Sequence, residues 1–449
     1  MASSLFSRPF FRIYGALWRL ARPFLKRSKR LADGWNERLA PEGWLNPDFP
    51  TADDHTVDIW IQAASGGEAR LAVAVCRQFS PSVPLRVLVA TWTRQGRDVM
   101  ENALADLKET HPRLAVAVRF APFDHPDIIR RALAQASPRL VALLETELWP
   151  GLLAACREKN IPVHIFNGRI NSSTAHFGKL FSSLMADISP KSIHTVSRYD
   201  SQGFSSIFPC PVTLMSNIKF DLAAKALSQP LTSSPHCFSA NGPVFLFASV
   251  RQCEEKRIPG QLERLYKAVP NAAVVIVPRH LYRVAAWKSV LDDLAFMPIL
   301  ASELPAGRSL PRRRVLIWDK FGDLPQLYAS ARAVFVGGSF GQGGQNFLES
   351  LSAGRIPCIG PSAHNFLWAM GTGDPSMPSL EQSGLLYVAH TPKDVIDIML
   401  THAASTRDRN AVREAFRQWL APRLGGAAST ARIMEQSVTA SRSASRGDI

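Results

Sequence analysis

Short apolar runs recur along most of this chain, separated by longer polar segments with helical periodicity. Runs that are apolar at nearly every position are typical of strands buried on both faces of a parallel sheet. The alternation therefore predicts βα units and a doubly wound α/β fold. The expected strands of the first half are Asp58–Ser65, Arg86–Thr93, Ala115–Phe123, Leu140–Thr146, Val163–Gly168, Ser192–Ser197 and Val212–Ser216.

A second series of apolar runs follows Lys225–Pro243, a segment rich in Ser and Pro that is typical of a linker. The expected strands there are Val244–Val250, Ala273–Pro278, Arg314–Asp319, Ala333–Gly338, Pro357–Gly360 and Leu385–Ala389. With 449 residues the chain is long enough for two such domains. We expect one over residues 41–224, a linker over 225–243, a second domain over 244–432 and a disordered tail over 433–449.

Basic residues are concentrated at the N-terminus. The formal net charge is +15, and residues 1–40 contain nine Lys and Arg against two acidic residues. At about 100° per residue, a basic face lies opposite an apolar stripe. The stripe comprises Phe10, Tyr14, Leu17, Trp18, Ala21, Phe24 and Leu25. We expect this basic amphipathic helix to lie in a membrane interface, because no run of about 18 apolar residues is present to span one. A surface helix packed on its own domain is the alternative.

Several classes of protein are disfavoured by the pattern of residues. The six cysteines include no C-x-x-C pair, which argues against a zinc ribbon or a disulfide framework and favours a reducing, cytosolic compartment. Nucleic-acid binding is not expected, because no aromatic-interleaved basic stripe occurs beyond residue 40. No nicotinamide fingerprint opens either half, no P-loop occurs, and no D-x-D triplet is present to hold a metal-bound nucleotide diphosphate.

Polar residues gather where the expected strands end, which is where α/β sheets bind ligands. Glu68 follows a glycine turn in Ser65-Gly66-Gly67-Glu68, where a carboxylate often serves only the helix dipole. Glu145 and Glu147 end an apolar strand, where a functional role and a structural ion pair are equally plausible. Arg169, in Asn167-Gly168-Arg169, is positioned to pair with a glutamate or a phosphate.

The second half carries two comparable groups. Arg279 and His280 end a strand in VPRH and suit a phosphate or a plain salt bridge. The segment VGGSFGQGGQNFLE, 336–349, predicts a strand, a glycine loop and a helix. Its backbone amides could hold one phosphate at the helix start while Glu349 bonds a ribose diol, or the segment could be merely a capped turn.

Taken together, the motifs resemble those of the 3-deoxy-D-manno-octulosonic acid (Kdo) transferases of lipopolysaccharide synthesis, and the resemblance runs from about residue 10 to 425. They occur in that family's order: SGGE at 65–68, ETELWPGL at 145–152, NGR at 167–169, NIKFD at 217–221, VPRH at 277–280, VGGSFGQGGQNFLE at 336–349 and GPSAHNF at 360–366. The resemblance implies a two-domain GT-B glycosyltransferase, monotopic on the cytoplasmic face of the inner membrane. It implies transfer of Kdo from CMP-Kdo to the tetraacyl disaccharide 1,4′-bisphosphate precursor of lipid A (lipid IVA), without a metal or other cofactor.

The same resemblance implies roles for individual residues. Glu68 would be the general base that deprotonates the acceptor hydroxyl. Glu147, with Glu145 near it, would stabilise oxocarbenium-like charge or orient the acceptor. Arg279 would bind the donor phosphate. The remaining nucleotide contacts would come from the loop and helix residues Gly338, Ser339, Asn346 and Glu349.

Three motifs depart from the family pattern. Its usual G-G-H-N contains Gln345 here, which cannot titrate. Its S-T-H reads Ser249-Val250-Arg251, in which Arg251 should favour an anionic donor sugar, and its N-A-R reads N-G-R. Two alternatives therefore remain: another GT-B enzyme that uses a UDP-sugar on a lipid-linked acceptor, or a non-catalytic membrane-associated binding protein of the same fold.

Overall fold

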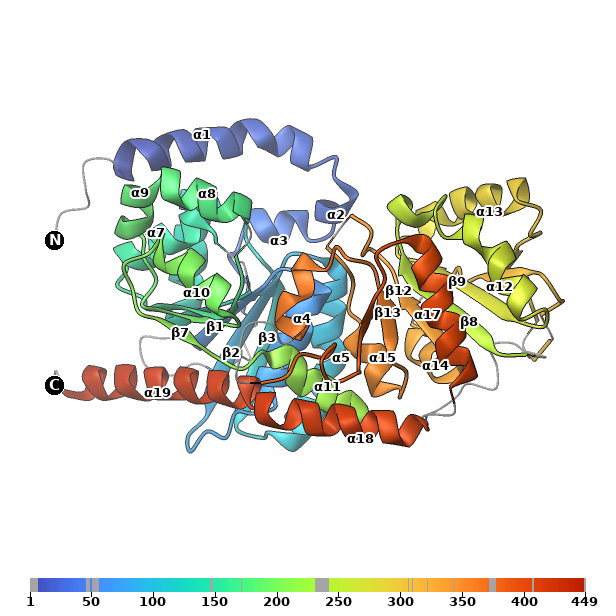
Figure 1. Cartoon of the computed structure of the whole chain (residues 1–449). Coiled ribbons are helices and arrows are strands. Elements are labelled where there is room, and N and C mark those ends of the chain that lie inside the picture. Colours follow the sequence, from blue (N-terminus) through green and yellow to red (C-terminus); the bar gives the residue numbers. More distant parts are fainter. Residues whose placement is uncertain are drawn as a thin grey trace. The chain divides into compact units, whose positions relative to one another are not determined.

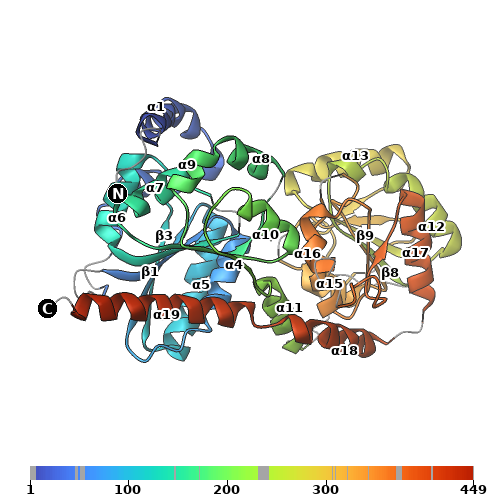
Figure 2. The same cartoon turned by 60° about the vertical axis from the view of Figure 1, so that its left-hand side comes forward.

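A computed structural model describes the whole chain except residues 1–6, 46–48, 51–55, 146–147, 171, 231–241, 306, 309, 321, 342, 371–376, 406–407 and 448–449. Its contacts define two compact units. Unit 1 comprises residues 1–222 and 424–449, and unit 2 comprises residues 223–423. Each unit contains a seven-stranded parallel sheet with helices on its faces, so the predicted doubly wound α/β fold is confirmed (Figures 1 and 2).

The sheet of unit 1 has the strand order β3-β2-β1-β4-β5-β6-β7. Its strands are β1 (Val57–Ala63), β2 (Leu85–Thr91), β3 (Leu114–Phe120), β4 (Pro138–Leu144), β5 (Val163–Gly168), β6 (Ser192–Thr195) and β7 (Val212–Leu214). Successive side chains of a strand enter opposite cores: Trp60 of β1 packs in one apolar cluster, and Ile59 and Ile61 pack in the other. The strand order reverses between β1 and β4, where doubly wound sheets bind ligands.

Helices cover both faces of this sheet. They are α4 (Gly66–Cys76), α5 (Arg94–Thr110), α6 (Pro126–Ala136), α7 (Pro150–Glu158), α8 (Ser172–Leu180), α9 (Ser182–Asp187), α10 (Arg198–Ser205) and α11 (Ile218–Ser228), of which α11 continues into unit 2. Helices α6 and α7 begin with Pro at their first position, where the missing N–H costs no helical hydrogen bond.

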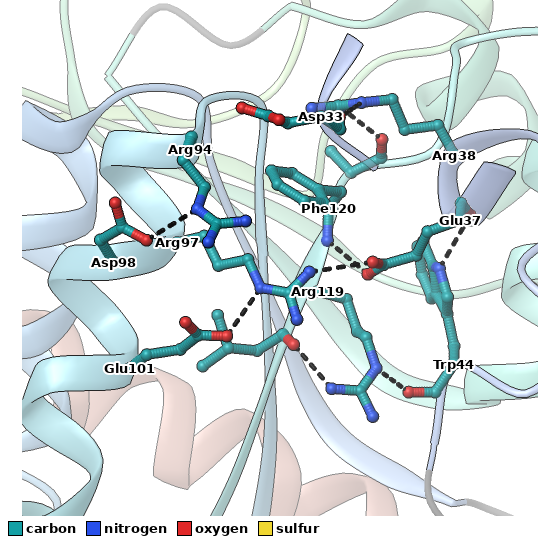
Figure 3. Close-up of polar contacts among 12 residues, drawn as sticks. Asp33, Glu37, Arg38, Trp44, Arg94, Arg97, Asp98, Glu101, Arg119 and Phe120 are labelled. Carbon is teal, nitrogen blue, oxygen red and sulfur yellow. Dashed lines mark hydrogen bonds and ion pairs between the residues drawn. The ribbon is translucent and has the colours of Figure 1, made fainter. Parts of the chain in front are cut away.

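The N-terminal segment forms α1 (Ser7–Leu25), α2 (Lys29–Ala32) and α3 (Trp35–Leu39). Figure 3 shows how α3 is joined to β3 and α5: the Glu37 carboxylate accepts the Phe120 N–H at 2.7 Å and pairs with Arg97 at 3.0 Å. Arg38 is fully buried, stacks on the Phe120 ring at 4.6 Å and donates to the Trp92 carbonyl at 2.7 Å. The segment is therefore an integral part of unit 1.

Helix α1 runs over the side of unit 1 that carries α7 to α9 (Figures 1 and 2). The apolar stripe expected to face a membrane is divided. Its members Phe10 and Trp18 pack on the core of unit 1, and Tyr14 donates a hydrogen bond to Asp124. A second apolar row points outward with exposed fractions between 58% and 73%: Ile13, Leu17, Leu20 and Phe24. No helix in the described part of the chain is long and apolar enough to cross a membrane.

The expectation of a disordered tail over 433–449 differs from the structure, in which Gly426–Gly447 form helix α19. Its buried side chains recur at helical spacing and pack with α4 and the sheet of unit 1: Ala427, Ala431, Met434 and Val438. Arg442 also pairs with the buried Asp58 of β1 at 2.9 Å. Because most residues of α19 are small or polar, its helical periodicity was not evident in the sequence. The second domain, predicted to end at residue 432, accordingly ends at Arg423, and unit 1 resumes at Leu424. Most of the predicted linker, 225–243, lies outside the described residues.

The sheet of unit 2 has the order β10-β11-β9-β8-β12-β13-β14. Its strands are β8 (Val244–Val250), β9 (Ala273–Pro278), β10 (Ile299–Leu300), β11 (Val315–Ile317), β12 (Ala333–Val336), β13 (Pro357–Ile359) and β14 (Tyr387–Val388). Its helices are α12 (Leu262–Ala268), α13 (Val284–Asp293), α14 (Leu324–Ser330), α15 (Leu348–Ser352), α16 (Leu367–Met370), α17 (Pro392–Ala404) and α18 (Arg409–Leu420). Among the strands of the described residues, only β10, two residues long, was not expected from the sequence.

Candidate functional site

Glu68 lies in the first turn of α4, directly after β1. Ser65 caps this helix: the Glu68 N–H donates to Ser65 Oγ at 3.5 Å, and the Ser65 N–H donates to Glu68 Oε2. This reciprocal capping box stabilises the helix start, so Glu68 has the structural role that its sequence position suggested. The capping bond uses Oε2 and not Oε1. Because β1 flanks the reversal in strand order, the carboxylate also lies where this fold binds ligands.

Glu145 follows β4, the strand next to β1, and adopts a left-handed conformation with φ of 62°. Lys219, at the start of α11, forms an ion pair with Glu145 Oε1. The buried Asn167, also left-handed with φ of 57°, donates from Nδ2 to the same oxygen at 3.4 Å. Its Oδ1 accepts the Ile218 N–H at 2.9 Å and so holds the start of α11 in place. Non-glycine residues in this conformation are uncommon and concentrate at functional sites.

Charges couple these residues electrostatically. Burial raises the pKa of the Glu68 carboxyl, and the nearby Glu145 raises it further. The hydrogen bonds from Ser65 and the positive charge of Lys219 act in the opposite direction. A raised pKa makes a carboxylate a stronger base, which suits proton abstraction from a hydroxyl. The arrangement thus has a basic carboxylate, a second carboxylate and a lysine at the carboxyl ends of neighbouring strands.

The other residues predicted for this site divide into two groups. Arg169 belongs to the same electrostatic cluster. Burial raises the pKa of Asp200, the charge of Arg169 opposes this rise, and the charge of Glu145 adds to it. Glu147 lies outside the described residues. Sequence reasoning did not assign roles to Lys219 or Asp200, although Lys219 lies within the quoted NIKFD motif.

The sequence-predicted residues of unit 2 form a positively charged group. Desolvation and the nearby Arg251 lower the pKa of the Arg279 guanidinium, whereas Glu349 raises it. His280 has a lowered pKa from desolvation and from the charges of Arg279 and Arg251. The mutual repulsion of Arg279 and Arg251 favours binding of an anion, whose negative charge would relieve it. Ser249, at the end of β8, has a left-handed φ of 54°.

The first amides of the glycine loop after β12 have an acceptor within the protein. The buried Glu254 carboxylate accepts the N–H of Gly338 at 2.9 Å and that of Ser339 at 3.2 Å. It also accepts the Arg251 N–H at 2.9 Å. These amides therefore already have an acceptor. Burial raises the pKa of Glu254, and its four backbone donors oppose the rise. Sequence reasoning missed Glu254, although an acidic residue just after an apolar strand was a visible signal.

Ser339 and Asn346 have clear structural contacts. The Ser339 hydroxyl is buried, donates to the Val336 carbonyl at 3.0 Å and accepts the Gly360 N–H at 2.7 Å. Asn346 is exposed and donates from Nδ2 to Glu349 at 3.1 Å. The helix that follows, α15, has only five residues. The structure therefore brings Arg279, Arg251, Glu349 and Asn346 together, whereas the Ser339 side chain is enclosed.

The described residues contain no group of three or more His, Cys, Asp or Glu side chains that could hold a metal ion. The side chains described at the two groups are carboxylates and a lysine in unit 1, and arginines with a carboxylate and an amide in unit 2.

A family model and several curated relatives share one description. The sequence model of the family described as 3-Deoxy-D-manno-octulosonic-acid transferase (kdotransferase) matches residues 33–222. The chain is 27% identical over 423 residues to the 3-deoxy-D-manno-octulosonic acid transferase of Bordetella pertussis, which covers 91% of this chain and 94% of that protein. It is 30% identical over 321 residues to the enzyme of the same name from Haemophilus influenzae, covering 69% of this chain and 71% of that protein.

Similarity to a solved structure gives evidence about the fold and not about the function. A glycosyltransferase from Rickettsia africae matches with a TM-score of 0.53 at 11% identity, over 85% of this chain and 99% of that one. The expected two-domain GT-B fold is confirmed by this likeness together with the two parallel sheets.

Proposed function

The chain belongs to the 3-deoxy-D-manno-octulosonic acid (Kdo) transferase family and is a glycosyltransferase of lipopolysaccharide synthesis; from this premise, we propose that it transfers Kdo from CMP-Kdo to the tetraacyl disaccharide bisphosphate precursor of lipid A. An acceptor hydroxyl attacks the anomeric carbon of Kdo, and the bond between that carbon and the phosphate oxygen breaks. CMP leaves with the bonding electrons. Glu68 takes the proton of the attacking hydroxyl.

The observation that carries this proposal is the cluster of Glu68, Glu145 and Lys219 where the strand order of unit 1 reverses. A base must be ionised and must be basic enough to accept a proton. Burial and Glu145 make Glu68 more basic, while Lys219 limits the rise in its pKa. Glu145, held by Lys219 and Asn167, is placed to orient the acceptor or to stabilise positive charge that develops on the donor sugar.

The donor is proposed to bind unit 2. CMP-Kdo carries one phosphate and one sugar carboxylate, and Arg279 with Arg251 supplies two fixed positive charges for them. Glu349, which accepts a hydrogen bond from Asn346, suits a ribose diol. The buried Glu254 keeps the glycine loop in shape by holding its amides.

The acceptor is an anionic lipid, and α1 is proposed to attach the enzyme peripherally to the cytoplasmic face of the inner membrane. The exposed apolar row Ile13, Leu17, Leu20 and Phe24 lies on a helix that also exposes Arg12, Arg19 and Arg22. Apolar side chains flanked by cations favour insertion into the headgroup region of anionic bilayers. Replacing Leu17 and Phe24 by Ser should weaken sedimentation with vesicles that contain phosphatidylglycerol. Unchanged sedimentation would contradict this attachment.

Incubation of the purified protein with the tetraacyl acceptor and either CMP-Kdo or a UDP-sugar tests the reaction. We expect CMP release and a product whose mass has increased by Kdo. Release of UDP with a UDP-sugar, and none with CMP-Kdo, would favour the other GT-B activity. No nucleotide release with either donor, together with an unchanged cell phenotype for Glu68→Ala, would favour a binding protein.

A further inference from the structure

Two adjacent buried glutamates follow β8 in unit 2. Glu254, which is fully buried, ends the short 3₁₀ helix η1 (Gln252–Glu254), and Glu255, which is 5% exposed, comes directly after it. Removing a carboxylate from water is costly unless it is paired with a cation or accepts hydrogen bonds. The contacts that offset this cost therefore indicate what the two side chains hold in place.

Glu254 joins the turn after β8 to the glycine loop after β12. Its Oε2 accepts the Arg251 N–H and the Gly338 N–H, each at 2.9 Å, and its Oε1 accepts the Ser339 N–H at 3.2 Å. Gly337 permits this close approach, because a Cβ atom there would lie 2.6 Å from Glu254 Oε2. One carboxylate thus fixes two segments that are far apart in the sequence.

Glu255 joins the same turn to the segment after β9. Its Oε1 accepts from Arg283 Nε at 2.8 Å, and its Oε2 accepts from Arg283 Nη2 at 2.5 Å. A bidentate pair of this kind fixes geometry as well as adding energy. Arg283 ends the 3₁₀ helix η3 (Leu281–Arg283), and its N–H donates to the His280 carbonyl at 2.9 Å. The VPRH motif, 277–280, is therefore linked to Glu255 through Arg283.

The three segments that these glutamates join follow neighbouring strands. Strand β8 lies between β9 and β12, and the strand order of unit 2 reverses there. The Arg279 N–H also donates to the Val250 carbonyl at 2.8 Å, which joins the ends of β9 and β8. Doubly wound sheets bind ligands at such a reversal. The two glutamates therefore brace the strand-end segments where this sheet is expected to bind its ligand.

Arg251 and Arg279 need this support, because their guanidinium groups repel each other. Desolvation and then the charge of Arg251 lower the pKa of Arg279, so the two cations are close enough to interact. In flexible loops this repulsion would separate them until an anion bound. Loops that are already held in the binding arrangement avoid the cost of being ordered when the ligand arrives. The braced turn thus keeps two like charges ready for an anionic donor.

We propose that Glu254 and Glu255 are positioning residues for the donor: by bracing the segments after β8, β9 and β12, they hold Arg251 and Arg279 in the arrangement that binds CMP-Kdo. This inference rests on the proposed function. Neither carboxylate contacts the donor in this arrangement, since backbone N–H groups occupy Glu254 and Arg283 occupies Glu255. Their effect on the reaction is an effect on donor affinity.

Glu254→Gln is the primary test, because it keeps the size of the side chain and replaces one acceptor oxygen by a donating amide group. At least one of the three N–H groups then loses its acceptor. We expect the Kd for CMP, measured by isothermal titration calorimetry, to rise about tenfold, the effect of one hydrogen bond to a charged group. The KM for CMP-Kdo should rise by a similar factor, while kcat at saturating donor and the KM for the acceptor stay at wild-type values.

The separate effects on KM and kcat distinguish positioning from loss of stability. A variant that is only partly folded contains less active enzyme, so its kcat falls while its KM for CMP-Kdo is unchanged. Urea unfolding of the same preparations gives the folded fraction. A fall in kcat without a rise in the KM for CMP-Kdo would overturn the proposal, and so would a wild-type Kd for CMP in Glu254→Gln.

Glu255→Gln tests the second link, and it keeps the inference testable if Glu254→Gln does not fold. Its partner Arg283 is partly exposed, so water can replace part of what the pair loses. We expect a higher Kd for CMP, and adding Arg283→Gln should raise it little further if the two residues act as a pair. Multiplicative increases would overturn this link.

The chain offers a matched control in the same unit. Arg264 Nε donates to Asp397 Oδ1 at 2.9 Å and joins two helices, α12 and α17. Asp397→Asn removes an arginine–carboxylate pair, as Glu255→Gln does, and should leave the Kd for CMP unchanged. A rise equal to that in Glu255→Gln would attribute the effect to general loosening of unit 2 and overturn the positioning role.

Binding of CMP separates failure of this inference from failure of the proposed function. A wild-type protein that binds CMP but transfers no Kdo, with weaker CMP binding in both glutamate variants, would overturn the proposed function and leave the positioning role intact. A wild-type protein that transfers Kdo, with unchanged CMP binding in both variants, would overturn the positioning role alone.

Discussion

Replacing Glu68 by Gln should abolish most Kdo transfer while leaving the fold nearly unchanged. Glu68 caps α4 through Oε2, and its proposed second task, taking a proton during catalysis, is separable from that structural one. Gln has nearly the same shape and can still accept the Ser65 N–H, because Glu and Gln both occur in this capping box. It cannot act as a base at neutral pH. The substitution therefore removes one task and retains the other.

The expected magnitudes differ enough to be measured. Complete loss of a helix cap costs about 0.5–2 kcal/mol, so the retained cap predicts a change in the free energy of unfolding of less than about 1 kcal/mol. Loss of a general base typically lowers the rate by about 10²–10⁴-fold. This corresponds to about 3–5 kcal/mol of transition-state stabilisation. The assay is release of CMP from CMP-Kdo with the tetraacyl acceptor in detergent micelles, alongside urea unfolding of the same preparations.

The chain offers a matched control in α17, whose capping box joins Thr391 and Asp394. The Thr391 N–H donates to Asp394 Oδ2 at 2.8 Å, and the Asp394 N–H donates to Thr391 Oγ1 at 3.2 Å. Asp394→Asn should change stability as little as Glu68→Gln and leave kcat at the wild-type level. If Glu68→Gln also retained wild-type kcat, Glu68 would be a capping residue only, and the catalytic reasoning would be refuted.

Three further outcomes are expected. Lys219→Met should move the acid limb of the kcat/KM profile to higher pH, because Lys219 lowers the pKa of Glu68 and the base acts in its ionised form; a limb that does not move would contradict the coupling, and Lys219→Arg should restore it. Burial lowers the pKa of His164 to about 4, so between that pH and about 6.5 the unfolded chain binds one more proton than the folded one and stability falls on acidification. Relative to His164→Asn, the wild type should lose about 3 kcal/mol over that range in urea titrations, and parallel pH profiles would refute this. Met434→Ala should lower the free energy of unfolding by about 2–5 kcal/mol if α19 is part of the core, whereas a disordered tail would show no change.

Strands were predictable because strands buried on both faces are apolar at nearly every position, and thirteen of the fourteen strands in the described part of the chain matched an expected range. The exception is Ile299–Leu300, whose two residues are only half-buried. Helix α19 was missed for a different reason: its buried face has two Ala, one Met and one Val, and its remaining surface is rich in Ser and Arg. The stabilising partner of that face, the sheet of unit 1, is distant in the sequence.

The N-terminal helix also shows that periodicity in the sequence does not identify the partner of a helix face. Periodicity placed Tyr14 and Leu17 on one stripe, and in the structure Tyr14 is half-buried and bonded to Asp124 whereas Leu17 is exposed. An amphipathic pattern indicates that a face will be covered, but it does not say whether protein or membrane covers it. The hydroxyl of Tyr14 finds its partner in Asp124, 110 positions away, and no local pattern predicts such a contact.

The sequence alone predicted the two doubly wound sheets and placed Glu68, Glu145 and Arg279 at strand ends. The strands follow from local periodicity, and the placement follows from the rule that parallel strands end on one edge of a sheet. Tertiary structure alone decided that Lys219 pairs with Glu145, that Glu254 occupies the amides of the glycine loop, and that Asp124 joins α1 to α7. Each of these is a buried or half-buried charge that needs a partner, and only the folded chain brings the partner within reach.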